Sequence, residues 1–327
     1  MQVSVENNPL VSLCIPTFNR VGLLKECIES VKDQSFKNIE ILVGNNFSTD
    51  GTADYLNGTS GLQVEHHQSN LGMVGNWNSL LRRARGQLCV LLSDDDIVAP
   101  DFVATLVQYM RDDQCAFAYS PVTIIDTAGS VLGETTASPL MEKSERFVKA
   151  TLEQKRVPYP SALMFRTADA AAVGYFKDIG NQTDVAFRIS LAEIHPGANI
   201  SCHPKPLVRY RIHAAALTDN PELKASGRIK FQHWVSERYD ASEVFCRMAI
   251  FDLINLRLKN FPVENSTFLF PGAEKSNFFV RRVNWIVQNK TSSLTLLIAV
   301  FPFLAVRHFV RLINNRRYHK RFLASST

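Results

Sequence analysis

The feature that most constrains this chain is an apolar run that ends abruptly in acids. Residues 88–92 read Leu-Cys-Val-Leu-Leu, and Ser93, Asp94, Asp95 and Asp96 follow at once. Such a run is typical of a buried strand, so it predicts three carboxylates at the strand's carboxyl end. Ligands of open α/β sheets bind at that edge. Neighbouring carboxylates repel one another unless water or a cation neutralises them, and an all-oxygen ligand set suits Mg²⁺ or Mn²⁺.

A simpler interpretation of the acids is a solvated turn that caps the next helix. Pro100 opens a helical pattern after them, and both proline and acidic residues are common where helices begin. The acidic stretch alone does not separate a ligand site from a helix cap. The elements around it are therefore needed to decide.

Strand and helix patterns alternate before the acidic stretch. The predicted strands cover residues 10–15, 39–43 and 62–66. The predicted helices cover residues 23–31, 48–56 and 73–84. This alternation predicts right-handed crossovers and a parallel sheet. The loops that follow the strands are then expected to meet at one edge of the sheet: residues 16–20, 44–48 and 93–96.

Shorter strands follow the acidic stretch. They are predicted at residues 116–119, 122–125, 131–133, 161–165 and 207–212. We predict helices at 143–153 and from Asp184 onward, and a loop at 134–142. From Pro221 the pattern is helical again.

The cysteines and the N-terminus indicate a cytoplasmic protein. The six cysteines are scattered and no two have metal-ligand spacing, which favours reduced thiols in the cytosol. The first ten residues lack the basic and apolar regions of an export signal. With 46% hydrophobic and 20% charged residues, the chain can bury one large core or two small ones.

The charge is divided unevenly along the chain. After Glu274 there are ten basic residues and no acid, so removing them from the net charge of +5 leaves −5 for residues 1–274. The apolar segment 294–306 is too short to span a bilayer, and it runs directly into the basic residues. This combination favours an interfacial helix on an anionic membrane. A core helix and an oligomer interface are the alternatives. We expect no nucleic-acid partner, since the basic residues form no recognisable binding motif.

Several segments resemble family-2 glycosyltransferases, which have an α/β fold that binds nucleotide sugars and is called GT-A. The matching segments are VSLCIPTFNR at 11–20, ILVGNNFSTDGT at 41–52, NLGMVGNWNSLLRRARG at 70–86 and LLSDDDIVAPDF at 91–102; residues 174–188 and 207–218 match more loosely. The resemblance implies a GT-A domain over residues 1–218, with a Rossmann-like, mostly parallel sheet flanked by helices. Residues 219–327 lie outside it, and there we expect a helical region with the basic, membrane-facing tail.

The resemblance implies a nucleotide site on the first two loops. Four residues of the first loop would lie near the base: Pro16, Thr17, Asn19 and Arg20. In the family a carboxylate in the second loop usually reads the base. Here Asn45 and Asn46 stand in its place. An amide oxygen of Asn45 can still accept that hydrogen bond, but its NH₂ group can also donate one, so the nucleotide stays open.

The acidic stretch resembles the family's DxD region. On that alignment Asp95 ligates a divalent metal, Mn²⁺ or Mg²⁺, and Asp94 faces the ribose. Asp96 either supports the metal or caps the next helix. The late motif at 207–218 would give Arg211 to the diphosphate and His213 to the metal or phosphate.

The resemblance places a catalytic base at Asp184, with Asp178 as the second candidate. Inversion needs a base on the face opposite the leaving group, which deprotonates the attacking hydroxyl. The local sequence around Asp184 fits a helix N-cap equally well.

Together these features predict a metal-dependent, inverting glycosyltransferase of the hexosyltransferase type. It would use a nucleoside diphosphate sugar and a glycan or lipid-linked acceptor, in bacterial surface polysaccharide or lipid-linked glycan synthesis. We expect it at the inner face of the cell membrane, attached peripherally. The alternatives are a non-catalytic sugar- or membrane-binding protein on the same fold and a nucleotidyltransferase.

Overall fold

The computed structural model describes residues 5–137, 139–152 and 158–212, together with scattered positions from 227 to 239. The chain divides into two compact units, Met1–Trp234 and Val235–Thr327. The basic tail and the predicted helical region beyond Pro221 lie almost entirely outside the described residues. The predicted domain boundary at residue 218 therefore stays a prediction.

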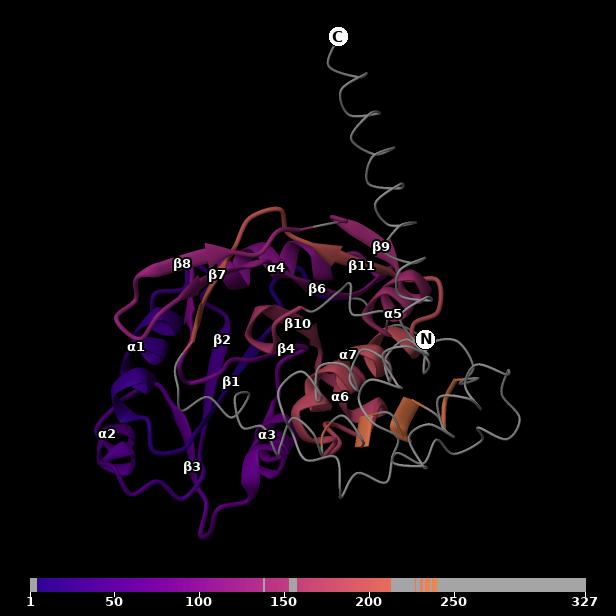
Figure 1. Ribbon diagram of the computed structural model, residues 1–327. Helices are drawn as coiled ribbons and strands as arrows, with labels where there is room; N and C mark the ends of the chain where they lie inside the picture. The colour runs from indigo at the N-terminus through magenta and orange to yellow at the C-terminus, as the bar shows by residue number, and fades with distance from the viewer. Residues whose placement is uncertain are drawn as a thin grey trace, which may run out of the picture. The chain divides into compact units, whose positions relative to one another are not determined.

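The larger of two sheets has eight strands in the order β3-β2-β1-β4-β10-β6-β11-β9 (Figure 1). Its first half is parallel and consists of β1 (Val11–Thr17), β2 (Ile39–Asn45), β3 (Gln63–His66) and β4 (Leu88–Leu91). The second half is mixed and consists of β6 (Cys115–Tyr119), β9 (Met141–Lys143), β10 (Leu163–Arg166) and β11 (Asn199–Cys202). The predicted α/β class with a mostly parallel sheet is confirmed.

A second sheet has four strands in the order β5-β12-β7-β8. They are β5 (Ile97–Val98), β7 (Val122–Ile125), β8 (Val131–Glu134) and β12 (Val208–Arg211). β12 pairs with β5 directly after the acidic stretch, with Val208 opposite Val98. This pairing brings the late motif beside the three acids.

Seven helices are described, and those of the first half match the predicted ranges. They are α1 (Val21–Lys32), α2 (Thr52–Asn57), α3 (Gly72–Arg83), α4 (Phe102–Met110), α5 (Ser144–Leu152), α6 (Thr167–Ala172) and α7 (Thr183–Glu193). Short 3₁₀ turns, η1 (Pro160–Ala162) and η2 (Gly180–Gln182), precede β10 and α7. α1 forms because Leu24, Cys27, Ile28 and Val31 recur at helical spacing and bury one face.

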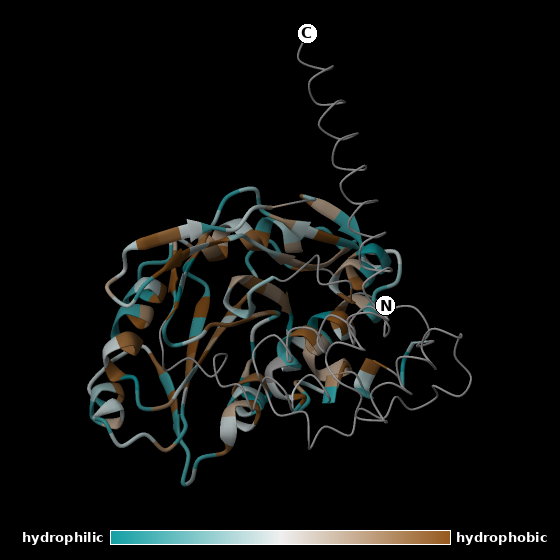
Figure 2. Cartoon of the chain, in the orientation of Figure 1, coloured by the Kyte–Doolittle hydropathy of each residue, from teal (hydrophilic) through white to brown (hydrophobic). Residues whose placement is uncertain are grey.

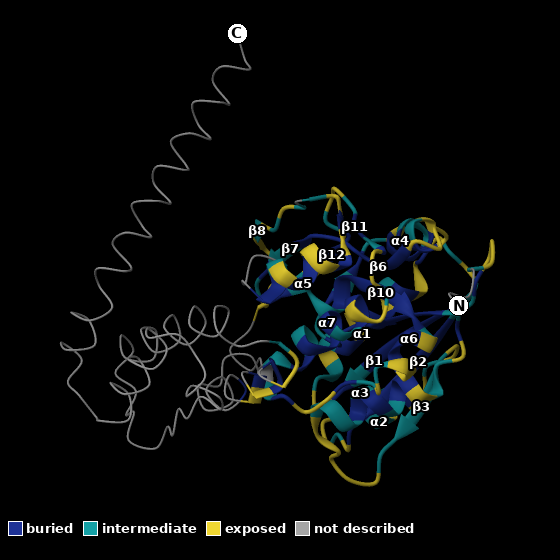
Figure 3. Ribbon diagram, turned by 90° about the vertical axis from the view of Figure 1, so that its right-hand side faces the viewer, coloured by how far each residue is buried: buried dark blue, intermediate teal, exposed yellow. Residues whose placement is uncertain are grey.

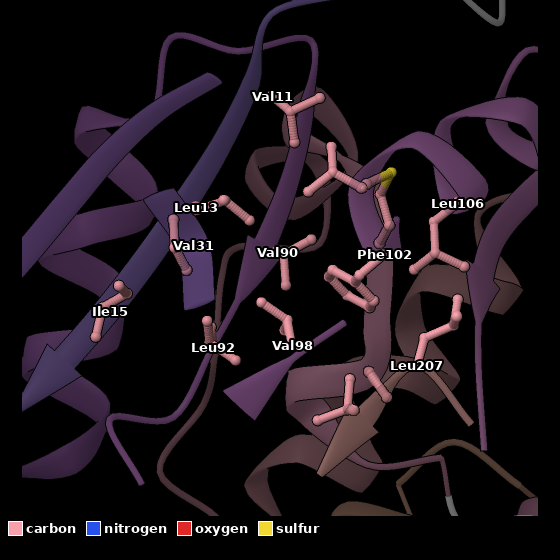
Figure 4. Close-up of a cluster of buried hydrophobic side chains, with 14 of the residues drawn as sticks. Val11, Leu13, Ile15, Val31, Val90, Leu92, Val98, Phe102, Leu106 and Leu207 are labelled. Atoms are coloured by element: carbon pink, nitrogen blue, oxygen red, sulfur yellow. The ribbon is translucent and has the colours of Figure 1, made fainter. Parts of the chain in front are cut away.

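The core lies between the parallel strands and the helices that cover them. Val11, Leu13 and Val90 of β1 and β4 face Phe102 and Leu106 of α4 (Figure 4). Figure 2 shows these strands as largely hydrophobic, and Figure 3 shows them as buried. Apolar runs buried on both faces are typical of parallel sheets covered by helices.

Some elements were missed or misplaced by the sequence patterns. The predicted loop at 134–142 contains the start of β9, and neither α6 nor β11 was predicted. These elements have three to six residues, too few for a periodic pattern. The five described cysteines are buried with free thiols, and Cys246 lies outside the described residues. No helix in the described part of the chain is long and apolar enough to cross a membrane.

Candidate active site

The three loops expected at one sheet edge do lie together. The backbone N–H of Asn46 donates to Thr17 O at 2.9 Å, which joins the loops after β1 and β2. Arg20 reaches from the first loop to the acidic stretch. Its Nη1 contacts Asp94 Oδ1 at 3.1 Å and Asp95 Oδ2 at 2.9 Å. One guanidinium therefore supplies the positive charge between two neighbouring carboxylates.

Asp94 is the carboxylate with a buried, unused oxygen. Its Oδ2 and Oγ1 of Thr17 are buried, and neither has a partner at full hydrogen-bond geometry among the described residues, although the Thr17 hydroxyl lies close enough to lower the pKa of Asp94. Burial raises the pKa of Asp94 to about 6, the charge of Asp95 adds to the rise, and Arg20 opposes it. A buried polar atom without a partner costs about 1–3 kcal/mol, so this pair of atoms fits a ligand hydroxyl.

Asp96 is fully buried and directs both oxygens at protein donors. Ser161 Oγ donates to Oδ2 at 2.5 Å, and the backbone N–H of Arg211 donates to Oδ1 at 3.0 Å. Burial raises the pKa of Asp96 to about 8, and the charge of Asp95 contributes. Asp96 thus ties the acidic stretch to η1 and β12.

Arg211 is turned inward rather than toward an open edge. Its Nη2 forms an ion pair with Glu26 Oε2 at 2.6 Å, while its Nε donates to Asp95 O and its Nη1 to Thr127 O, both at 3.0 Å. The guanidinium that was predicted to meet the diphosphate fastens α1 and the β7–β8 turn to the acidic stretch. His213 lies outside the described residues.

The two asparagines of the second loop organise the protein itself. Asn45 Oδ1 accepts from Ser48 N at 3.1 Å, and Asn45 Nδ2 lies 3.0 Å from His66 Nδ1. Because the amide nitrogen faces Nδ1, that imidazole nitrogen is the acceptor. Asn46 binds the loop between β3 and α3, with its Oδ1 accepting from Leu71 N at 2.8 Å. Both ends of the Asn45 amide are engaged before any base is present.

Asn19 holds the first and second loops together. Its backbone has φ of 53°, its Oδ1 accepts from Thr49 N at 2.7 Å, and its N–H donates to Ser48 Oγ at 2.9 Å. Pro16 is half-buried at the end of β1. The first-loop residues of the prediction thus share one edge with the acids.

The candidate base Asp184 stands in the first turn of α7. Arg188, one turn later and almost fully buried, donates from Nη1 to Asp184 Oδ2 at 2.7 Å. Tyr210 belongs to β12. Burial raises the pKa of Tyr210 to about 12, with contributions from the charges of Asp96, Asp95 and Asp184. Tyr210 directly precedes Arg211, whose backbone N–H binds Asp96, so the phenol belongs to the strand that borders the acidic stretch.

Asp178, the second candidate base, is much more exposed than Asp184. The Asp178 side chain is 69% exposed and pairs with Lys230 Nζ at 3.5 Å. The sequence patterns did not indicate Arg188, Tyr210, Ser161 or Glu26 as members of the site. Tyr210 lies within the late motif at 207–218, but the contact made by Ser161 depends on a partner 65 residues away.

Metal ligands are few in the described part of the chain. It contains no group of three or more His, Cys, Asp or Glu side chains arranged to hold a metal ion. Mg²⁺ usually takes one or two protein carboxylates, several waters and substrate phosphates. The Asp95 side chain is 12% exposed and that of Asp94 is 5% exposed. Asp95 is therefore the more accessible of the two carboxylates, and one such carboxylate is enough for an ion that also binds water and phosphate.

Comparisons with known proteins match the same part of the chain. Residues 12–171 match the family model Glycosyl transferase family 2. EpsH of Bacillus subtilis (strain 168), described as a glycosyltransferase, is 23% identical over 222 residues, which are 66% of this chain and 64% of EpsH. A GalNAc(5)-diNAcBac-PP-undecaprenol beta-1,3-glucosyltransferase of Campylobacter jejuni is 30% identical over 148 residues, which are 42% of this chain and 45% of that protein. The chain thus spans less than two thirds of either relative.

Solved structures share the fold. Residues 1–349 of Staphylococcus aureus TarS superpose with a TM-score of 0.58 and 16% identity, over 79% of this chain and 75% of that one. The mannosyltransferase PcManGT from Pyrobaculum calidifontis, in complex with GDP-Man and Mn²⁺, gives a TM-score of 0.56 and 16% identity, over 93% of this chain and 81% of that one.

Proposed function

Because the chain belongs to glycosyltransferase family 2, we propose that it moves a sugar from a nucleoside diphosphate sugar to an acceptor hydroxyl, with inversion at the anomeric carbon. The observation that carries this proposal is the pair of carboxylates after β4, Asp94 and Asp95, which the guanidinium of Arg20 in the first loop binds. The proposal adds Asp184, in the first turn of α7, as the acid that would serve the acceptor.

The donor nucleotide would bind at the edge formed by the loops after β1, β2 and β4. Asp94 Oδ2 and Thr17 Oγ1, both buried without a described partner, suit the ribose hydroxyls. Asn45 would shape the second loop through its hydrogen bonds to Ser48 and His66, because these bonds already occupy both ends of its amide. The base would then be read by other groups of these loops, which keeps the choice of nucleotide open.

A divalent cation would be held by Asp95 together with the donor's phosphates. Mn²⁺ or Mg²⁺ in this place would neutralise charge on the departing diphosphate. Arg20 contacts Asp95, so its guanidinium would also offer charge to a phosphate held there. We assign Asp96 and Arg211 to fixing the acidic stretch, since both are saturated by protein groups.

Asp184 would act as the base. Its Oδ2 is held by Arg188, which fixes the rotamer and leaves Oδ1 to accept the proton of the attacking hydroxyl. The side chain of Asp184 is 23% exposed, so an acceptor can reach it. As the hydroxyl attacks, the bond from the anomeric carbon to the diphosphate oxygen breaks, and the electron pair leaves with the diphosphate.

The acceptor would be a glycan or a lipid-linked sugar. A relative named for its action on an undecaprenol-linked glycan supports this choice. The ten basic residues after Glu274, beside the apolar segment 294–306, support attachment to an anionic membrane at its inner face.

The first test is a thermal-shift titration of the full chain with UDP, GDP, dTDP and CMP, each with and without Mn²⁺. We expect one nucleotide to raise the Tm, and to do so more strongly with Mn²⁺. Asp95→Ala should remove the Mn²⁺-dependent part of the shift and keep the rest. A chain that binds none of the four nucleotides and cleaves no nucleotide sugar would contradict the proposal.

A further inference from the structure

A buried asparagine in α3 holds the backbone of the segment that leads to α7. Asn78 Oδ1 accepts a hydrogen bond from the N–H of Phe176 at 3.0 Å, and Asn78 Nδ2 donates to the carbonyl of the same residue at 2.9 Å. The two residues are 98 positions apart, and both bonds are buried. One amide thus matches both polar groups of a single residue, which fixes the segment in distance and orientation.

Two neighbours of Asn78 on α3 contact the same turn. The ring of Trp77 meets that of Phe176 edge-on, with centroids 4.9 Å apart, and the Arg82 guanidinium lies 4.8 Å from the Tyr175 ring centroid. Tyr175 has φ of 62°. A non-glycine residue in that region costs on the order of 1–3 kcal/mol and persists only where its surroundings impose it. The contacts from α3 supply that constraint.

Phe176 connects the clamped turn to α7, the helix that contains the candidate base. Its ring stacks on Phe187 of α7, with centroids 4.0 Å apart and an interplanar angle of 25°. Phe187 in turn packs edge-on against Phe165 of β10, with ring centroids 5.3 Å apart. Figures 1 and 3 both show α7 beside β10. Asp184 lies three residues before Phe187, so a shift of Phe176 would move the carboxylate.

The other anchors of α3 lead to the donor loops. Asn76 Nδ2 donates to the carbonyl of Gly44 in β2 at 2.9 Å. Asn46, in the loop after β2, donates to Gly72 O at 3.3 Å, where α3 begins. One rigid helix is therefore fixed to the nucleotide loops and, through Asn78, to the segment before α7.

We infer that Asn78 is a positioning residue that sets the placement of Asp184 relative to the donor loops, by clamping the Phe176 backbone to α3. The inference rests on the proposed role of Asp184 as base. It assigns no contact between Asn78 and substrate. Its physical basis is the sensitivity of transfer reactions to geometry, since a displacement of about 1 Å can cost on the order of 100-fold in rate.

The test variant is Asn78→Asp, which keeps the side-chain volume. A carboxylate still accepts from the Phe176 N–H, but it places a second oxygen against the Phe176 carbonyl. We expect kcat for cleavage of UDP-GlcNAc or GDP-mannose, whichever nucleotide binds, to fall roughly 10- to 100-fold. KM and nucleotide affinity should stay within about twofold. Hydrogen exchange in the peptide around Phe176 should accelerate.

Ser79→Ala is the matched control. Ser79 is the next residue of α3, but its Oγ contacts His67 and Asn76 O and not the clamped turn. This variant should keep the wild-type kcat. Arg82→Ala keeps the buried core intact and removes only the exposed cation–π contact with Tyr175. It should lower kcat by roughly threefold even if Asn78→Asp folds poorly.

Two kinetic results would overturn the inference. One is a wild-type kcat in Asn78→Asp despite faster exchange at Phe176. The other is a parallel loss of nucleotide affinity and kcat, which indicates general damage. Failure of the proposed function looks different: the wild type would cleave no nucleotide sugar, or Asp184→Asn would be fully active. Unchanged exchange at Phe176 in Asn78→Asp would refute the clamp in either case.

Discussion

At the scale of single residues, the site is defined by which polar atoms the protein leaves without partners. Asp96 and Arg211 are saturated by protein groups, whereas Asp94 Oδ2 and Thr17 Oγ1 are buried without a described partner. Atoms that cost stability in the unliganded protein gain hydrogen bonds when a ligand arrives. Unsatisfied atoms at a sheet edge are therefore better indicators of binding than the acids alone.

Thr17→Val tests this distinction. The substitution keeps the shape of the side chain and removes the hydroxyl, so nucleotide affinity should fall by about 3- to 10-fold. The Tm of the unliganded protein should fall only slightly, because the Thr17 hydroxyl makes at most a weak contact with Asp94. Isothermal titration and thermal melts measure the two quantities. Thr151→Val is the control, since its hydroxyl is also buried without a described partner but belongs to α5. A normal affinity in Thr17→Val would contradict the assignment.

The sequence predicted which loops meet better than it predicted which partners their side chains bind. The three loops, with the acids in one of them, were expected at one edge, because strand order and crossover handedness determine which loops meet. Asp184 was proposed from the family resemblance and stays a prediction. Strand order could not predict the hydrogen-bond partners of Asn45, Asp96 and Arg211. Their partners His66, Ser161 and Glu26 lie 21, 65 and 185 residues away, and only the folded chain brings them within reach.

At the scale of elements, one carboxylate joins β1, β2 and the end of α3. Glu40 accepts from Ser12 Oγ at 2.6 Å, from Arg85 N at 2.7 Å and from Gln63 Nε2 at 3.0 Å. Burial opposes ionisation, but these hydrogen bonds outweigh it and lower the pKa of Glu40. The pairing of β1 with β2, which carries two of the site loops, is stabilised by this group.

The stability of the wild type should therefore exceed that of Glu40→Gln at neutral pH. A depressed folded-state pKa contributes stability that is present above the unfolded value, about 4.3, and is lost as the pH falls through the folded value. We expect a difference of about 1–3 kcal/mol near pH 7 that shrinks below about pH 4. Urea unfolding across that range measures it. A difference independent of pH would contradict the role of the charge.

At the scale of the whole molecule, charge divides the chain into an acidic body and a basic tail. The tail lies outside the described residues, so its role rests on sequence, with ten basic residues after Glu274. Each basic residue near an anionic surface contributes about 1 kcal/mol of binding free energy. Under the proposed function, such a tail would hold the protein at the membrane surface, where lipid-linked acceptors lie.

Replacing Arg316, Arg317, Lys320 and Arg321 with glutamine in the full chain tests the tail. Binding to phosphatidylserine vesicles, measured by co-sedimentation at low salt, should weaken at least ~10-fold. Nucleotide affinity should be unchanged. Replacing Lys143, Lys149, Lys177 and Lys205 of the body is the matched control for total charge. Equal losses in both variants would contradict a specific role for the tail.

The central claim is that Asp184 removes the acceptor's proton in a transfer reaction supported by the acidic stretch. The most direct measurement is the rate of nucleoside diphosphate release from the bound nucleotide sugar by the wild type, Asp184→Asn and Asp178→Asn, with nucleotide affinity measured in parallel. We predict that Asp184→Asn slows release by at least ~100-fold at unchanged affinity, and that Asp178→Asn keeps the wild-type rate. Wild-type release by Asp184→Asn, or a large loss in Asp178→Asn instead, would contradict the account.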